Sequence, residues 1–249
     1  MAITSNAAIT MSALRTEYKD GTGPVSMSEL NRGGGNFPLG GTRNNTVPTT
    51  DNNLAFSKYR NTSKTVVVTY EIIGAGGTGG FGVHNEGEQF RGTYGATGGT
   101  SQIKNGSTAL VTVIGGGGGE NCKLGRGHAG ENGAASHYGS GGAGGSQNSN
   151  GNTPATNSYG AGGGGGGGDF GNLYDVGGCA GEGGGAGTRQ TGTFTVIYDT
   201  VITLTIGAKG ATNTIAYYGA SGADGYGKLT WDANVHTRTN TGVGTGTIN

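Results

Sequence analysis

The sequence predicts a mainly β and irregular fold, in which short strands frame a glycine-rich core of packed polyglycine II-type helices. Three observations lead to this prediction. Glycine accounts for 60 of the 249 residues and proline for only 4. The hydrophobic share is 31%, too low for a large aliphatic core. Runs rich in β-branched residues, which favour strands, recur between the glycine tracts.

Four runs have the composition of strands, and this part of the chain shows no convincing helical period. They are Lys64 to Ile73, Thr108 to Ile114, Phe194 to Ile206 and Tyr226 to Trp231. In the first three runs, the last isoleucine is followed directly by glycine. Such a recurring strand-then-glycine unit indicates one domain built by repetition, which we assign to residues 64–233.

The glycine tracts lie between these runs, at Gly74 to Gly99, Gly115 to Gly145 and Gly160 to Gly187. Polyglycine II-type helices have three residues per turn and no internal hydrogen bonds, so their N–H and C=O groups point outward. Only glycine lets neighbouring main chains approach closely enough to satisfy those groups. The alternatives are flexible or disordered linkers, because glycine is costly to order, and a conventional glycine-tolerant β-sandwich.

Residues 1–63 are polar, hold few glycines and carry three related phrases, at Ile9 to Arg15, Val25 to Arg32 and Leu54 to Arg60. In each phrase a serine follows Met or Phe and is placed to cap a turn of helix. A phrase of this size cannot bury itself, so we expect a small N-terminal attachment region that docks on a partner. The expected attachment residues are Met11, Ser12, Leu14, Arg15, Met27, Ser28, Leu30, Arg32, Phe56, Ser57, Tyr59 and Arg60.

The remaining residues, 234–249, are expected to form a polar C-terminal tail. Lys+Arg and Asp+Glu both number 15, so no positive surplus is present for nucleic-acid binding. No run of about 18 apolar residues predicts a membrane span, and the first residues lack the features of a signal peptide. Cys122 and Cys179 are expected to be free thiols in a reducing compartment, with a disulfide formed after release as the alternative.

Two glycine-rich motifs resemble nucleotide-binding motifs but lack the neighbouring residues that such binding requires. Gly74 to Gly79 fits the dinucleotide-binding pattern after a strand, yet the following Gly80-Phe81-Gly82 is a poor helix start. Gly222 to Leu229 approaches a phosphate-binding loop, but leucine occupies the position of the magnesium-ligating Ser or Thr.

No catalytic or metal-binding constellation emerges from the other polar residues. The histidines lack the spacing of a zinc site, and no Cys pair supports one. Neither a nucleophile elbow nor an acid–base carboxylate pair is visible. The chain is therefore expected to be non-enzymatic, with no cofactor and no metal. The histidines are His84, His128, His137 and His236.

Aromatic side chains occur within or beside the glycine tracts, and the stretch Ser146 to Tyr159 has the composition of an exposed loop. Tyrosine mixed with Ser, Gly and Asn is typical of adaptable binding loops. The alternative is that the aromatics cover a thin core. The residues expected at ligand-contacting loop tips are Phe81, His84, Phe90, Tyr94, Tyr138, Asn152, Tyr159, Phe170, Tyr174, Tyr217 and Tyr218.

The strand-to-glycine domain ending in Gly-Tyr-Gly-Lys-Leu-Thr-Trp (225–231) resembles glycine-rich domains of phage tail fibres. The interleaving of glycine tracts with Tyr and Asn loops is similar to the distal adhesins of T-even-type phages. The phrases around Ser12, Ser28 and Ser57 resemble short repeats of phage tail proteins, including those of cyanophages. The typical N-terminal opening of the T-even adhesins is missing, which leaves the mode of attachment open.

The resemblance implies a virion protein, assembled in the host cytoplasm, that binds a host surface protein or glycan at the tip of a tail fibre. It implies that residues 1–63 attach to a trimeric fibre or another tail protein, since three phrases in one chain would match three equivalent surfaces. Two alternatives are a purely structural tail-fibre or baseplate subunit, as a homotrimer for example, and a glycine-rich extracellular surface protein unrelated to phage.

Overall fold

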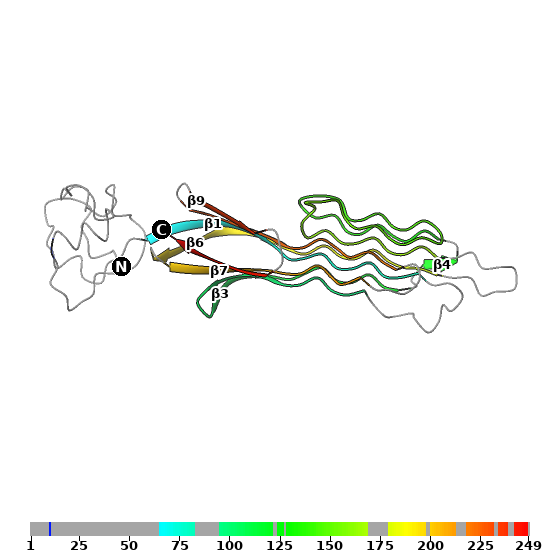
Figure 1. The fold of residues 1–249 in the computed structure, drawn as a ribbon, viewed down its shortest axis with the longest axis horizontal. Coiled ribbons are helices and arrows are strands. Elements are labelled where there is room, and N and C mark those ends of the chain that lie inside the picture. The colour runs from blue at the N-terminus through cyan, green and yellow to red at the C-terminus, as the bar shows by residue number, and fades with distance from the viewer. Residues whose placement is uncertain are drawn as a thin grey trace.

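The computed structural model of the chain describes residue 10 and the ranges 65–82, 95–121, 124–126, 128–168, 179–197, 200–212, 218–231, 234–238 and 242–248. Strands and extended irregular segments make up these residues, without a helix among them (Figure 1). The mainly β prediction is therefore confirmed for the described part of the chain. All twelve expected attachment residues of the N-terminal phrases lie outside it.

Among the described residues, the strands form two four-stranded antiparallel sheets, ordered β6-β1-β8-β9 and β10-β7-β2-β3, and one small pair, β4-β5. The hairpin from β2 to β3 turns through Gly106, whose φ of 57° lies in the left-handed region that glycine adopts readily. The strands are β1 (Thr65–Ile73), β2 (Ser101–Asn105), β3 (Thr108–Val113), β4 (Leu124–Arg126), β5 (Cys179–Ala180), β6 (Arg189–Ile197), β7 (Thr200–Ile206), β8 (Tyr226–Trp231), β9 (Asn234–Arg238) and β10 (Gly242–Ile248).

A hydrophobic core lies between the two four-stranded sheets. Along β1, alternate residues are buried, as expected for a strand with one face against a core. Their side chains pack with those of β7, β2 and β3 from the opposite sheet, and Val196 of β6 with Leu229 and Trp231 of β8 complete the cluster. The members from β1 and the opposite sheet are Val66, Val68, Tyr70, Ile72, Ile103, Val111, Val113, Ile202, Leu204 and Ile206.

Three of the four predicted strands are confirmed by β1, β3 and β8, with small differences at their ends. The expected single run from Phe194 to Ile206 is wrong, because β6 ends at Ile197 in one sheet and β7 begins at Thr200 in the other. The sequence between them contains Asp199, a residue type depleted in strands and common in turns.

The expectation of a separate polar tail at 234–249 does not hold for the residues that the structure describes there. β9 pairs with β8, and β10 pairs with β7 over Gly242–Ile248. Both strands lie at the edges of their sheets, each with one partner strand.

Glycine segments continue six of the strands beyond one end of the sandwich (Figure 1). β1 and β7 run directly into glycine segments, β3 is followed by one after Ile114, and β2, β6 and β8 are each preceded by one. The wavy traces in Figure 1 lie side by side along the long axis of the molecule, and residues 128–168 add further segments to them. We call all of these the glycine segments; they are 74–82, 95–100, 115–121, 128–146, 149–168, 181–188, 207–212 and 218–225.

Hydrogen bonds join the glycine segments with a recurrence of three residues. In segment 74–80, every third N–H donates to the same neighbouring segment, and the acceptors there are also three residues apart. Three neighbours accept from this one segment, and carbonyls of the same segment accept from three others. The donor–acceptor pairs are Gly74–Thr188, Gly77–Gly185, Gly80–Glu182, Ala75–Gly99, Thr78–Ala96, Gly76–Ala223 and Gly79–Ala220.

A second segment, residues 161–168, is enclosed in the same way and is buried throughout. Each of its amides from Gly162 to Gly168 donates to a backbone carbonyl outside residues 161–168. A methyl group on Gly164 would overlap the carbonyl oxygen of Ala143 and lie 2.5 Å from its carbonyl carbon. Side chains are thus excluded here by the closeness of neighbouring main chains.

Cys179 in β5 is disulfide-bonded, so the expectation of a free thiol is wrong for this residue. The sequence holds one other cysteine, Cys122. A long separation in sequence carries no information about distance in space, because the glycine segments bring remote parts of the chain together. Within the described ranges, no helix is long and apolar enough to cross a membrane.

Candidate binding surface: a tyrosine cluster and an adjoining cavity

The structure describes five of the eleven residues expected at loop tips, and one of the five predictions is wrong. Phe81 is only 2% exposed, so its side chain fills the interior and cannot meet a ligand at the surface. Tyr138 and Tyr218 are 38% and 37% exposed, Asn152 is exposed and Tyr159 is half-buried. Six expected contacts lie outside the described residues: His84, Phe90, Tyr94, Phe170, Tyr174 and Tyr217.

Tyr138 and Tyr159 come together around a third tyrosine that the sequence analysis treated only as a strand residue. Tyr226, the first residue of β8, has its ring centroid 5.0 Å from that of Tyr138 and 5.1 Å from that of Tyr159. Tyr138 and Tyr159 lie edge to face at 5.6 Å, and His137 adds a further edge contact to Tyr138. Such aromatic pairs each add about 0.5–1.5 kcal/mol beyond burial of their area.

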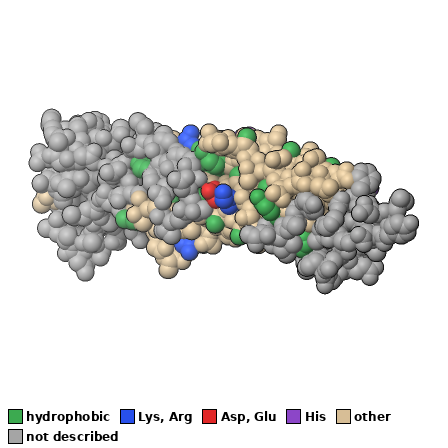
Figure 2. Space-filling view, turned by 45° about the vertical axis from the view of Figure 1, so that its right-hand side comes forward, with side chains coloured by type: hydrophobic (Ala, Val, Ile, Leu, Met, Phe, Trp, Pro, Cys, Tyr) green, Lys and Arg blue, Asp and Glu red, His purple; other side chains and the backbone are tan. Residues whose placement is uncertain are grey.

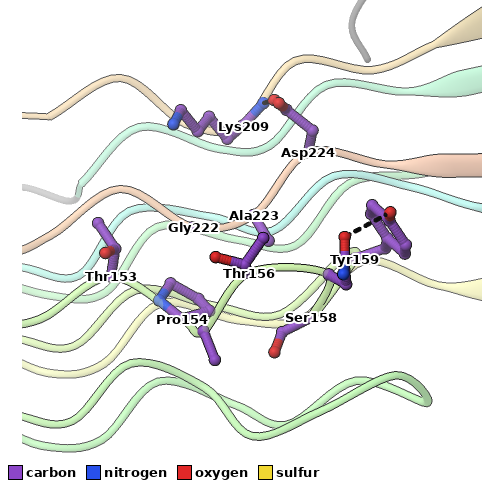
Figure 3. Close-up of a pocket in the computed structure, with 11 residues that line it drawn as sticks. Thr153, Pro154, Thr156, Ser158, Tyr159, Lys209, Gly222, Ala223 and Asp224 are labelled. Carbon is purple, nitrogen blue, oxygen red and sulfur yellow. Dashed lines mark hydrogen bonds between the residues drawn. The ribbon is translucent and has the colours of Figure 1, made fainter. Parts of the chain in front are cut away.

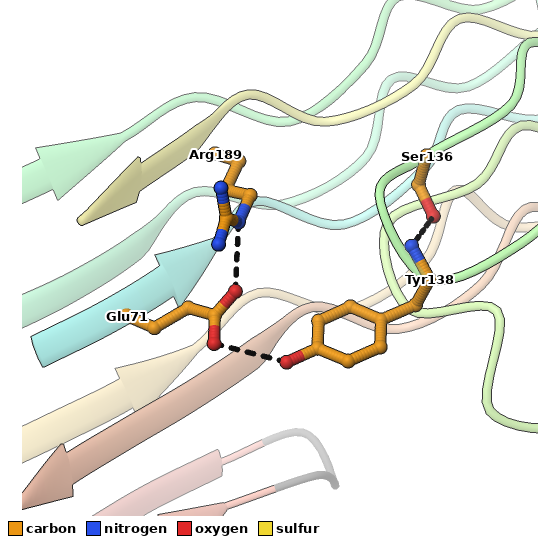
Figure 4. Close-up of polar contacts among 4 residues, drawn as sticks. All are labelled: Glu71, Ser136, Tyr138 and Arg189. Atoms are coloured by element: carbon orange, nitrogen blue, oxygen red, sulfur yellow. Dashed lines mark hydrogen bonds and ion pairs between the residues drawn. The ribbon is translucent and has the colours of Figure 1, made fainter.

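Polar contacts fix the orientation of the tyrosine cluster on the sandwich (Figure 4). The Tyr138 hydroxyl donates to Oε2 of Glu71 at 3.0 Å, and Nε of Arg189 donates to Oε1 at 2.7 Å. Tyr138 lies in a turn in which its own N–H donates to Oγ of Ser136 at 3.2 Å. The carboxylate of β1 therefore links β6 to a turn in the glycine segments.

Electrostatics keep this link intact at neutral pH. Burial alone would raise the pKa of the Glu71 carboxyl, but hydrogen bonds from Arg189 and Tyr138, with the charge of Arg189, outweigh it and lower that pKa. Burial raises the pKa of the Tyr138 hydroxyl, and the neighbouring Tyr226 and Glu71 raise it further. Glu71 is therefore ionised and Tyr138 protonated at pH 7, which is the donor–acceptor pairing that the contact requires.

A cavity of about 350 Å³ opens beside Tyr159 (Figure 3). One wall is the stretch Thr153 to Tyr159, and the other combines Lys209 with the backbone of Gly222 to Asp224. Within the first wall, Asn157 adopts a φ of 68°, a left-handed conformation that asparagine tolerates better than most residues. In the second wall, the N–H of Lys209 donates to Oδ1 of Asp224 at 3.1 Å.

Several polar groups of this cavity have no internal partner among the described residues. The Tyr159 hydroxyl donates to Oδ1 of Asn157 at 2.9 Å, which leaves the Asn157 amide nitrogen as an available donor. No hydrogen bond or ion pair within the described ranges engages the Lys209 ammonium or the hydroxyls of Thr153 and Thr156. The cavity therefore presents unsatisfied donors and acceptors to solvent.

Charge is sparse on the described surface. Among the described residues on the face in Figure 2, polar uncharged and backbone atoms predominate, with scattered hydrophobic side chains, a few basic ones and an acidic one beside a basic one. Arg189 and Glu71 form an ion pair, with side chains 39% and 18% exposed. Among the residues that the structure describes, no group of three or more His, Cys, Asp or Glu side chains could hold a metal ion.

The dinucleotide-like motif is buried in the main-chain network. The amides from Gly74 to Gly79 all donate to backbone carbonyls of other segments. They are therefore not available to a pyrophosphate, whose recognition needs free amides at a helix N-terminus.

The chain leaves the described glycine segments at one common end. The N–H of Phe81 donates to Oδ1 of Asn121 at 2.9 Å, and the N–H of Gly168 donates to the carbonyl of His128 at 3.0 Å. The described residues at 82, 95, 121, 128, 168 and 179 therefore lie near this end.

Comparison with known proteins gave no significant similarity, whether to a protein-family model, a curated protein or a solved structure.

Proposed function

We propose that the glycine segments are packed polyglycine II-type helices that form a rigid platform. The three-residue recurrence of their hydrogen bonds supports this proposal, because the polyglycine II helix has three residues per turn. Burial follows the same recurrence at Gly116 and Gly119 and at Gly142 and Gly145. Every amide of 74–80 and of 162–168 donates to a main-chain carbonyl, which supports a rigid platform.

On this platform, the chain acts as a phage tail-fibre tip protein that binds a host surface receptor. The observation that carries the proposal is the common end at which the glycine segments stop. Five expected contacts, His84, Phe90, Tyr94, Phe170 and Tyr174, fall in the sequence between residues 82 and 95 or between residues 168 and 179, and these four bordering residues lie near that end. Recognition residues commonly lie on loops held by a rigid scaffold.

Residues 1–63 attach this protein to the rest of the tail in the proposed arrangement. Their three related phrases would match the three equivalent surfaces of a trimeric fibre. Deletion of residues 1–63 should abolish incorporation into the fibre and leave the described domain folded. Normal incorporation of the truncated chain would contradict this role.

Binding of the purified, fluorescently labelled chain to a panel of bacterial strains tests the receptor-binding role. Replacement of residues 169–178 by a glycine–serine segment of equal length should abolish binding to a positive strain. The control is Ser107→Ala in the hairpin at the far end of β2 and β3 from the glycine segments, which leaves Gly106 and its left-handed φ unchanged. Incorporation into virions without binding to any host strain would favour the purely structural role instead.

A further inference from the structure

We propose that the cavity formed by residues 153–159, Lys209 and Gly222–Asp224 is a binding site for a neutral saccharide. This site lies beside β8, because the ring of Tyr159 stacks on that of Tyr226, and none of its lining residues is among the described residues at the common end of the glycine segments. The proposal deepens the proposed function by naming one receptor chemistry. Its physical argument uses only described residues.

The walls of the cavity are well fixed. The backbone of Gly222 packs against the main chain of Gly76, so that a methyl group on Gly222 would lie 2.5 Å from the Gly76 carbonyl carbon. On the opposite wall, Ser158 and Gly160 are buried, and the N–H of Ala161 donates to the carbonyl of Ser158 at 3.0 Å. Binding would therefore require little ordering of the protein, which favours affinity for a small ligand.

The available groups match a polyhydroxylated ligand. Lys209, Asn157 and the two threonine hydroxyls offer donors, while the hydroxyls and the Asp224 carboxylate offer acceptors. In Figure 3, Lys209 and Asp224 lie on one side of the Gly222–Ala223 backbone, and Thr153 and Thr156 lie on the other. Sugar hydroxyls donate and accept at once, so a saccharide can satisfy such a mixed set.

Charge and size narrow the class of ligand. One ammonium and one carboxylate line the cavity, which gives no net charge to attract an anionic sugar or a phosphate. Tyr159 supplies an aromatic surface, backed by Tyr226, for the apolar face of a sugar ring. A volume of about 350 Å³ lies at the lower end of the range for small-molecule sites, which suits a short saccharide.

Saturation-transfer NMR on the full-length chain tests the site, with glucose, galactose, mannose, N-acetylglucosamine and a β-linked disaccharide of each as probes. At least one neutral probe should receive saturation. Asn157→Gly should lower the affinity for that probe about tenfold, because it removes one side-chain amide that can hydrogen-bond to the ligand but keeps the left-handed backbone conformation. Thr156→Val should weaken it as well.

A matched control lies in the same molecule. Asn148 also adopts a left-handed φ, of 58°, but does not line the cavity, so Asn148→Gly should bind the probe as tightly as the unsubstituted chain. The proposal is overturned if no neutral probe binds, if only an added anionic probe, 3′-sialyllactose, binds, or if Asn157→Gly and Thr156→Val both retain full affinity. If the chain binds cells but no saccharide, only the saccharide site is contradicted. If it binds a saccharide but no cells, the receptor-binding role is contradicted instead.

Discussion

A pair of adjacent glycines offers a sharp test of close main-chain packing. Gly116 is buried, and a methyl group there would overlap the carbonyl oxygen of Gly185 and lie 2.5 Å from its carbonyl carbon. Gly117 is exposed, and a methyl group there would meet no atom within 4 Å. Alanine is therefore excluded sterically at one position and accommodated freely at the next.

The cost of Gly116→Ala follows from the contacts that must give way. The N–H of Gly116 donates to the carbonyl oxygen of Ala75 at 2.8 Å, and the carbonyl oxygen of Gly116 accepts from the N–H of Gly98 at 2.9 Å. Relief of the overlap has to move a backbone, with an overpacking cost of about 1–3 kcal/mol. Loss of one or both hydrogen bonds adds about 0.5–1.5 kcal/mol each. We expect Gly116→Ala to lower the free energy of unfolding by about 1.5–6 kcal/mol, a large share of the about 5–15 kcal/mol typical of a domain.

Equilibrium unfolding in guanidinium chloride, followed by circular dichroism, measures both variants. Gly117→Ala should be neutral or stabilising by about 0.4–1 kcal/mol, because alanine reduces the entropy of the unfolded chain. Equal destabilisation by the two substitutions, or none by either, would refute the steric reasoning. The fold of each variant can be checked by the near-ultraviolet signal of Trp231, which belongs to the hydrophobic core of the sandwich.

Three further predictions concern the contacts that hold the glycine segments to the sandwich and to one another. Tyr138→Phe removes the hydrogen bond to Glu71 and should lower the free energy of unfolding by about 0.5–1.5 kcal/mol; an unchanged value in urea unfolding would contradict the link. The pKa of the Glu71 carboxyl in the folded protein lies below its ordinary value of 4.5, so its contribution to stability should be fully present above pH 4.5 and should be lost as the pH falls through the lowered pKa. NMR titration of the side chain measures this pKa. Glu71→Gln should make the free energy of unfolding less dependent on pH in the acid range. Reduction of the disulfide at Cys179 should lower the free energy of unfolding by about 2–4 kcal/mol and shift the denaturant midpoint downward. An identical midpoint with and without dithiothreitol would show that this bond does not contribute to stability.

The strands with a strong β-branched composition were predictable from sequence because their alternation reports directly on burial. β1 and β8 match their predicted ranges closely. β9 and β10 were not predicted, because edge strands with one partner do not need an apolar face on every second residue. The Asn105-Gly106-Ser107 stretch between β2 and β3 carried a usable hairpin signal that the sequence analysis missed.

The candidate site was only partly predictable. Tyr138 and Tyr159 were expected at the surface because Ser, Asn and Gly surround them in the sequence, and both contribute to the tyrosine cluster. Tyr226 and Glu71 read as ordinary strand residues, since their role depends on a turn that comes from a distant part of the chain. Phe81 was misjudged because a glycine-rich neighbourhood resembles a loop in sequence, although these glycines are buried.

Residue-resolved amide hydrogen exchange by NMR tests packed glycine main chains most directly. All amides from Gly162 to Gly168 should be protected to a degree comparable with β1, because each donates to a backbone carbonyl of a neighbouring stretch of main chain. In segment 115–121, Gly116 and Gly119 should be protected while Gly117 and Gly118, whose amides have no acceptor among the described residues, exchange quickly. Uniformly rapid exchange across 162–168, with β1 still protected, would contradict an ordered glycine platform.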